Sequence, residues 1–191
     1  ASPQYDPPAA QRGCTLKTSL AGECTPDLVP GYEHNHDDFY YNYVAGVDAL
    51  HREGITGKGV TVAIVDSGLW EHEALMKDTA GRNRVLARYD ALADKVDSEV
   101  VDESGHGTHM TSIIAHSGKT LRNGRPTGSY KGAAPDAQLV AVKVLDREGF
   151  AHVLEIVRAI QWVVDNREKY NIRVLNLSFA QKPRWPYWED P

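Results

Sequence analysis

The chain has only two cysteines in 191 residues, Cys14 and Cys24, and nine residues separate them. Cysteine number and spacing favour a local disulfide, and two unconnected thiols are the alternative. A metal site is not expected here, because the nearest histidines, His34 and His36, have no second cysteine pair beside them. The sparse cysteines therefore exclude a disulfide-rich scaffold.

Long apolar runs and clusters of Lys and Arg are also missing. No apolar stretch approaches the roughly 20 residues that a membrane-spanning helix needs, so no membrane partner is expected. The 21 basic residues are scattered among 26 acidic ones, giving a net charge of -5, which argues against nucleic-acid binding. Residues 1–8 lack the pattern of a signal peptide, although a secreted protein whose leader had been removed would look the same.

The composition that is present, 41% hydrophobic and 25% charged, is typical of a globular domain, alone or with one appendage. Prolines and a polar run at 33–38 interrupt any periodicity before residue 43. We therefore expect an irregular N-terminal extension over residues 1–42 and a domain over residues 43–191. Helical spacing between Val44 and His51 begins that domain, and Gly54 ends the helix.

Strand and helix patterns alternate after Gly57. Residues 60–65 form a nearly continuous β-branched run, as in a parallel strand covered on both faces. Further strands are expected at 85–89, 139–145 and 174–178, with helices at 107–115 and 153–164. This order predicts an α/β fold with a doubly wound, mostly parallel sheet and helices on both faces. Active sites of such sheets lie at the carboxyl ends of strands, which selects Asp66 and the segment around Ser178.

Asp66 and His106 are the candidates for chemistry. Asp66 directly follows the apolar strand, and the alternative to a functional role is an Asx-turn that closes it. Glycines flank His106 and leave room around its imidazole, while Ser104 is a candidate cap of the following helix. A histidine oriented by a carboxylate is the base that nucleophilic catalysis needs. The alternatives are an ordinary loop histidine or a metal site with His109, but the spacing of three does not fit the zinc-protease pattern.

Four segments resemble the motifs of the subtilisin-like serine proteases (subtilases), in the order of that family. Residues 62–68 (VAIVDSG), followed by His72, are similar to its Asp motif, and residues 105–109 (GHGTH) to its His motif. Residues 132–145 resemble the connector and strand that follow, and residues 176–179 (NLSF) resemble the strand that lines the substrate cleft. The resemblance implies a subtilisin-like fold, incomplete at its C-terminus, and a serine endopeptidase acting on extended polypeptides.

The resemblance also assigns roles to residues. Asp66 would orient the base, and His106 would be the general base and acid. Ser178, Phe179 and Ala180 would form one wall of the substrate-binding pocket. Their backbone would pair with an extended substrate, which would add to the sheet as a strand. Gly149 would lie on the facing edge. The family usually has glycine at the position of Ala180, so the extra methyl group would narrow or reshape the pocket.

The family's nucleophilic serine has no counterpart in these 191 residues. That serine lies in a Gly-Thr-Ser motif downstream of the cleft strand, and the oxyanion-hole Asn precedes it. None of the other candidate serines is expected to act as the nucleophile. Ser67 adjoins the carboxylate of Asp66 on the same turn, and Ser104 is too near His106 in the chain to approach its ring. The backbone of Ser178 is needed to pair with substrate. We therefore expect the serine to lie outside this chain, with the missing C-terminal part of the domain as a partner. The alternative is a truncated, inactive fragment with a binding role or none.

No cofactor is required by this chemistry. Calcium often stabilises the family, and the acidic stretch at 94–103 offers oxygens, but no recognisable ligand loop is present and no metal site is assigned. The resemblance implies a secreted, extracellular protein.

Overall fold

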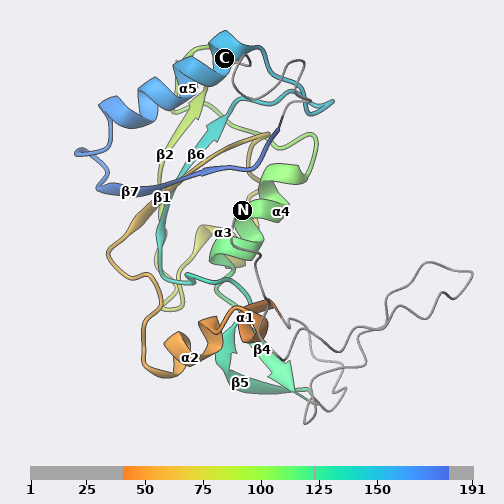
Figure 1. Ribbon diagram of the computed structural model, residues 1–191, viewed down its shortest axis with the longest axis vertical. Helices are drawn as coiled ribbons and strands as arrows, with labels where there is room; N and C mark the ends of the chain where they lie inside the picture. The colour runs from red at the N-terminus through yellow and green to blue at the C-terminus, as the bar shows by residue number, and fades with distance from the viewer. Residues whose placement is uncertain (1–40, 123, 181–191) are drawn as a thin grey trace, which may run out of the picture. The chain divides into compact units, whose positions relative to one another are not determined.

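A computed structural model describes residues 41–122 and 124–180 (Figure 1). Cys14 and Cys24, and all but the last two residues of the expected extension 1–42, lie outside this part of the chain. The disulfide therefore stays a prediction. Every described element belongs to one compact unit of the chain.

A five-stranded sheet forms the centre of this unit, with the strand order β3-β2-β6-β1-β7 (Figure 1). The strands are β1 (Thr61–Asp66), β2 (Val85–Asp90), β3 (Lys95–Val96), β6 (Gln138–Lys143) and β7 (Ile172–Leu177). β1 pairs in parallel with β6 and β7, and β2 pairs in parallel with β6. Only β3 is antiparallel. The predicted α/β fold with a mostly parallel sheet is confirmed.

Helices cover both faces of the sheet, so all six residues of β1 are buried. Val65 faces α5 (Val153–Asp165) and packs in one cluster with Ala159 and Val163 of that helix. Ile64, on the opposite face, packs with Ala115 at the end of α4 (His106–Ala115). Successive residues of a strand point to opposite faces, so the apolar run of β1 supplies both cores.

The helix expected near residues 44–51 is divided into two short helices. α1 (Tyr41–Val44) and α2 (Val47–Arg52) are separated by Gly46, which has a φ of 72°. α2 lies against a hairpin that the sequence did not predict, β4 (Lys119–Arg122) with β5 (Arg125–Tyr130). Buried His51 connects them, because its Nε2 lies 3.0 Å from the Ala133 carbonyl and its Nδ1 accepts from the Tyr130 N–H.

Arg84 is the largest fully buried side chain of the described residues, one position before β2. Its guanidinium donates to four backbone carbonyls, those of Leu75, Pro135, Ala74 and Ala115. The first and third lie in α3 (Glu73–Met76), and the last ends α4. Burial lowers the pKa of Arg84 to about 10, well above neutral pH, so the side chain is a buried cation that joins three segments.

Candidate active site

Asp66 and His106 meet at the carboxyl end of β1. Asp66 is the last residue of the strand and is 1% exposed, while His106 opens α4 with a side chain 42% exposed. The Nδ1 of His106 lies 2.7 Å from the Oδ1 of Asp66. A carboxylate oxygen accepts hydrogen bonds, so Nδ1 is the donor in this contact and Nε2 is the ring nitrogen that faces away from Asp66. The structure therefore brings together the two residues that the sequence selected.

Glycines allow the start of α4 to lie directly against the turn after Asp66. A Cβ at Gly107 would come within 2.4 Å of the carbonyl oxygen of Gly68. Gly68 itself has a φ of 129°, and a Cβ there would come within 2.5 Å of the carbonyl oxygen of Val100. Side chains at these two positions would force the backbones apart and separate the carboxylate from the imidazole. One glycine in each motif, Gly68 and Gly107, is therefore required by the close approach of the two backbones.

Asp102 is a second buried carboxylate that the sequence did not point out. It is fully buried and accepts four hydrogen bonds, from Ser67 Oγ (2.7 Å), Gly105 N–H (2.8 Å), Thr108 N–H (2.8 Å) and Thr108 Oγ1 (2.6 Å). The expected cap of α4, Ser104, makes no capping hydrogen bond, so that prediction was wrong. Asp102 instead accepts the hydrogen bond of a free backbone N–H in the first turn, that of Thr108. The one feature of the sequence that could have indicated this role is an Asp four residues before His106.

The hydrogen bonds of Asp102 hold the two turns of the site together. Ser67 Oγ donates to Asp102 and accepts from the Gly107 N–H at 2.9 Å. Burial alone would raise the pKa of Asp102, but the hydrogen bonds from Thr108, Ser67 and Gly105 outweigh it and lower that pKa below its ordinary value. Asp102 is therefore an ionised group that fixes the start of α4 relative to the Asp66 turn.

Lys143, the last residue of β6, is a buried lysine that contacts the same turn. Its Nζ donates to the carbonyls of Ser67 (2.9 Å) and Val101 (2.8 Å), and it lies 3.3 Å from Oε2 of Glu103. The lysine thereby connects the end of a central strand to the turn after Asp66 and to the loop before His106. Asp102 and Lys143 together fix the turn after Asp66 and the loop before His106.

Substitution of Asp102 by asparagine is expected to destabilise the chain in a pH-dependent way. The asparagine amide has one acceptor oxygen where the carboxylate has two, so it cannot accept all four hydrogen bonds. We therefore expect a loss of about 2–3 kcal/mol in the free energy of unfolding at pH 7. Since the folded-state pKa of Asp102 is lowered, its contribution is present above its unfolded pKa of about 3.9 and is lost as the pH falls below it.

Urea unfolding of the wild-type and Asp102→Asn chains at pH 7 and at pH 3 measures this difference. The control is Asp97→Asn, at an exposed residue whose side chain makes no hydrogen bond or ion pair within the described residues. A difference between wild type and Asp102→Asn that stays constant from pH 7 to pH 3 would contradict the lowered pKa.

The residues expected to bind substrate lie at the same edge of the sheet. Ser178, Phe179 and Ala180 directly follow β7, whose Leu177 is paired with Val65 of β1. Phe179 packs partly against the core beneath α5. Gly149 lies in a turn after β6 with a φ of 81°, and its neighbour Phe150 is 73% exposed. The structure places both segments beside the Asp66 edge, and their binding roles stay predictions.

No serine hydroxyl hydrogen-bonds to His106 Nε2 within residues 41–122 and 124–180. Ser67 Oγ is bonded to Asp102, and Ser178 Oγ lies 2.9 Å from Asn176 Nδ2. The same part of the chain contains no group of three His, Cys, Asp or Glu side chains placed to hold a metal ion. It also contains no helix with the length and apolar character needed to cross a membrane.

Comparison with known proteins agrees with this geometry. Residues 57–190 match the protein-family model described as the Subtilase family. The serine protease AprX of Bacillus subtilis strain 168 is 36% identical over 114 residues, 60% of this chain and 23% of AprX. The minor extracellular protease Epr of the same strain is 32% identical over 131 residues, 68% of this chain and 17% of Epr.

A solved structure shows the same fold. The CspB protease of Clostridium perfringens aligns with a TM-score of 0.62 and 21% identity, covering 75% of this chain and 33% of that one. The chain spans less than a quarter of the length of the two curated relatives. Because the family match covers most of the chain, including Asp66, His106 and the strands that position them, this protein belongs to the subtilase family.

Proposed function

We propose that this chain supplies the Asp and His of a serine endopeptidase. The observation that carries the proposal is the 2.7 Å contact between Asp66 Oδ1 and His106 Nδ1. The carboxylate is buried and the imidazole is 42% exposed, so Nε2 can reach a nucleophile and a substrate. This is the arrangement in which a carboxylate fixes the tautomer of a histidine base.

The reaction would be acyl transfer through a serine ester. His106 Nε2 takes the proton of the serine hydroxyl as its oxygen attacks the peptide carbonyl, and the imidazolium is stabilised by Asp66. His106 then gives that proton to the leaving amine, and water hydrolyses the ester with the same histidine as base. An extended polypeptide would lie along residues 178–180, and Gly149 would face it across the cleft.

Apolar surface on α5 and β7 supports a further segment that carries the serine. Four apolar residues of α5 are exposed: Val153, Leu154, Val157 and Val164. On β7, which is an edge strand within the described sheet, Val174 and Leu177 are 48% and 42% exposed. A soluble protein rarely leaves so much apolar surface and an open edge uncovered. We propose that additional chain packs here and completes the active site.

The likeness to an extracellular protease of Bacillus subtilis supports a secreted protein. Secretion also fits the proposed activity, because an endopeptidase that recognises main chain is best kept away from the proteins of its own cytoplasm. The proposed substrates are extracellular polypeptides, and no cofactor takes part in the proton transfers described above.

Labelling with a serine-directed fluorophosphonate tests the proposal. We expect no labelling of the 191-residue chain and stoichiometric labelling of the natural gene product, on a serine that follows Ala180 in sequence. Substitution of His106 by alanine in that product should slow labelling at least about 10³-fold, because the serine loses its base. Stoichiometric labelling of the 191-residue chain, or a gene product that is never labelled, would overturn the proposal. The second result would assign a non-catalytic, binding role.

A further inference from the structure

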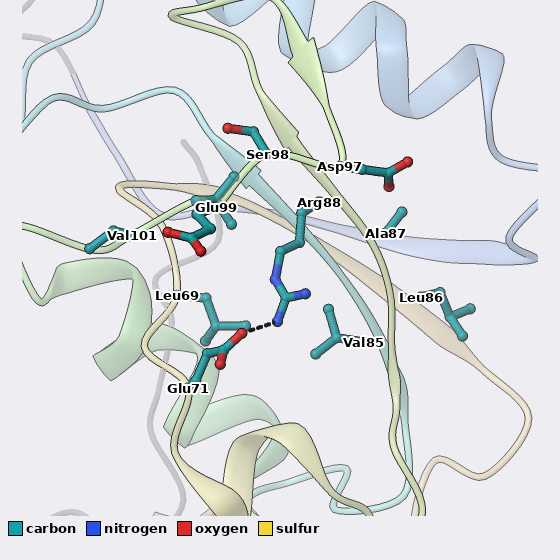
Figure 2. Close-up of a pocket in the computed structure, with 11 residues that line it drawn as sticks. Leu69, Glu71, Val85, Leu86, Ala87, Arg88, Asp97, Ser98, Glu99 and Val101 are labelled. Carbon is teal, nitrogen blue, oxygen red and sulfur yellow. Dashed lines mark hydrogen bonds and ion pairs between the residues drawn. The ribbon is translucent and has the colours of Figure 1, made fainter.

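A slot of about 380 Å³ lies between the edge of β2 and the loop that leads to His106 (Figure 2). Residues 85–88 form one wall and residues 97–101 form the other, with Leu69 and Glu71 between them. Side chains of a strand alternate between the two faces of the sheet. A cavity that touches four consecutive residues of β2 must therefore run along the edge of that strand rather than lie on one face.

The edge of β2 is unpaired along this slot. β3 pairs only with Tyr89 and Asp90, and the last contact before the two segments diverge is the hydrogen bond from the Asp97 N–H to the Arg88 carbonyl, 2.8 Å. The opposite end of the loop is fixed by the Leu69 N–H, which donates to the Val100 carbonyl at 2.8 Å. Within the described sheet, residues 85–87 have no strand on their outer side.

The charge of the slot is acidic. Three carboxylates line it, those of Glu71, Asp97 and Glu99, against one guanidinium, that of Arg88. Glu71 forms an ion pair with Arg88 at 2.8 Å. Neither Asp97 nor Glu99 forms an ion pair or a side-chain hydrogen bond with any described residue. Figure 2 shows Glu71 and Glu99 on the same side of the Arg88 side chain.

We propose that the slot binds an extended segment of a basic polypeptide. The segment would add to the free edge of β2 as a strand, using main-chain hydrogen bonds, the mode by which many domains capture peptides. Its lysine or arginine side chains would lie against Glu99 and Asp97, and the alternate side chains would contact apolar surface contributed by Leu69, Leu86 and Val101. The unpaired edge and the carboxylates of Glu99 and Asp97, neither of which forms an ion pair with a described residue, select this ligand over an acidic or a compact one. Asp97 has a weaker electrostatic contact, because it adds to the effect of Tyr170 in raising the pKa of Lys169.

The slot is built from the same two turns as the catalytic pair. Leu69 lies three residues after Asp66, and Val101 precedes Asp102, which holds the start of α4. A bound segment would therefore be anchored beside the active site without occupying His106. Binding at this slot requires no peptide hydrolysis, so it can be tested whether or not the chain takes part in a protease.

The test is binding of a short, end-blocked peptide in which valine and lysine alternate, measured by fluorescence anisotropy with the full chain at low ionic strength. We expect Asp97→Asn and Glu99→Gln each to weaken binding about two- to five-fold, as for exposed charge pairs. Glu168→Gln, at an exposed glutamate after α5, is the matched control and should leave the affinity unchanged. Hydrogen exchange should slow at the amides of residues 85–88 when the peptide binds.

Two further peptides separate strand addition from simple charge attraction. A peptide with glutamate in place of lysine should not bind, and one with alternate backbone amides methylated should bind at least about ten-fold more weakly, because it cannot pair with β2. Equal binding of the methylated peptide, unchanged exchange at residues 85–88, or equal affinities of Glu99→Gln and Glu168→Gln would each overturn the proposal.

Discussion

Substitution of Asp66 by asparagine is expected to lower kcat/KM for peptide hydrolysis by the complete gene product about 10⁴-fold at neutral pH. The Oδ1 of Asp66 accepts from His106 Nδ1 at 2.7 Å, which keeps the proton on Nδ1 and the lone pair on Nε2. An asparagine amide can instead donate to Nδ1, which would move the ring proton to Nε2. The histidine would then be oriented correctly but could not accept the proton of the serine.

The matched control is Asp165→Asn, the same chemical change at an exposed residue of α5 whose side chain accepts a hydrogen bond from Gln161. Its kcat/KM should stay within about two-fold of wild type. Fluorophosphonate labelling and peptide hydrolysis should fall together in Asp66→Asn, because both need the activated serine. More than a tenth of the wild-type activity in Asp66→Asn would rule out the role assigned to this carboxylate.

The central elements could be predicted because their patterns are long and continuous. The apolar run at 60–65 became β1 at 61–66, and the helix expected at 153–164 became α5 at 153–165. The hairpin of β4 and β5 could not be predicted, because its strands are short, half-exposed and rich in polar residues, so no alternation marks them. The position of the hairpin depends on its contact with α2. That contact includes His51 and Ser129, which are 78 residues apart in the sequence.

The contact between Asp66 and His106 could be predicted because each residue lies at the end of a recognisable element and near a glycine, Gly68 or Gly107, whose replacement would cause a clash. Asp102 and Lys143 lacked such a signal. Asp102 lies in an irregular loop and meets Ser67 across 35 residues of sequence, and Lys143 meets Ser67 across 76 residues. Lys143 lies inside the apolar run at 139–145, where a single lysine gives no indication of the partners it will have in the fold. Such long-range polar contacts become visible only when the strands are placed side by side.

Loss of Arg84 should produce the largest fall in stability of any substitution discussed. We expect Arg84→Met to lower the free energy of unfolding by about 3–5 kcal/mol at pH 7, measured by urea denaturation of the chain. Methionine fills a similar volume but donates nothing, so the carbonyls of Leu75, Pro135 and Ala115 would lose their donor while still buried. With a pKa of about 10, Arg84 is protonated in both states near neutral pH, so this loss should not change between pH 6 and pH 8.

Two comparisons show whether the hydrogen bonds rather than the charge or the volume carry this effect. Arg88→Met, four residues further along the chain, removes a half-exposed arginine paired with an exposed glutamate, and should cost less than about 1 kcal/mol. Arg84→Lys keeps the charge but replaces a planar fork by a single ammonium, which cannot reach carbonyls on three segments at once. It should therefore recover only part of the loss. Equal destabilisation by Arg84→Met and Arg88→Met would contradict this role, because the four carbonyls would then have found other donors. In that case α3, α4 and the segment at Pro135 would be held together by their apolar contacts instead.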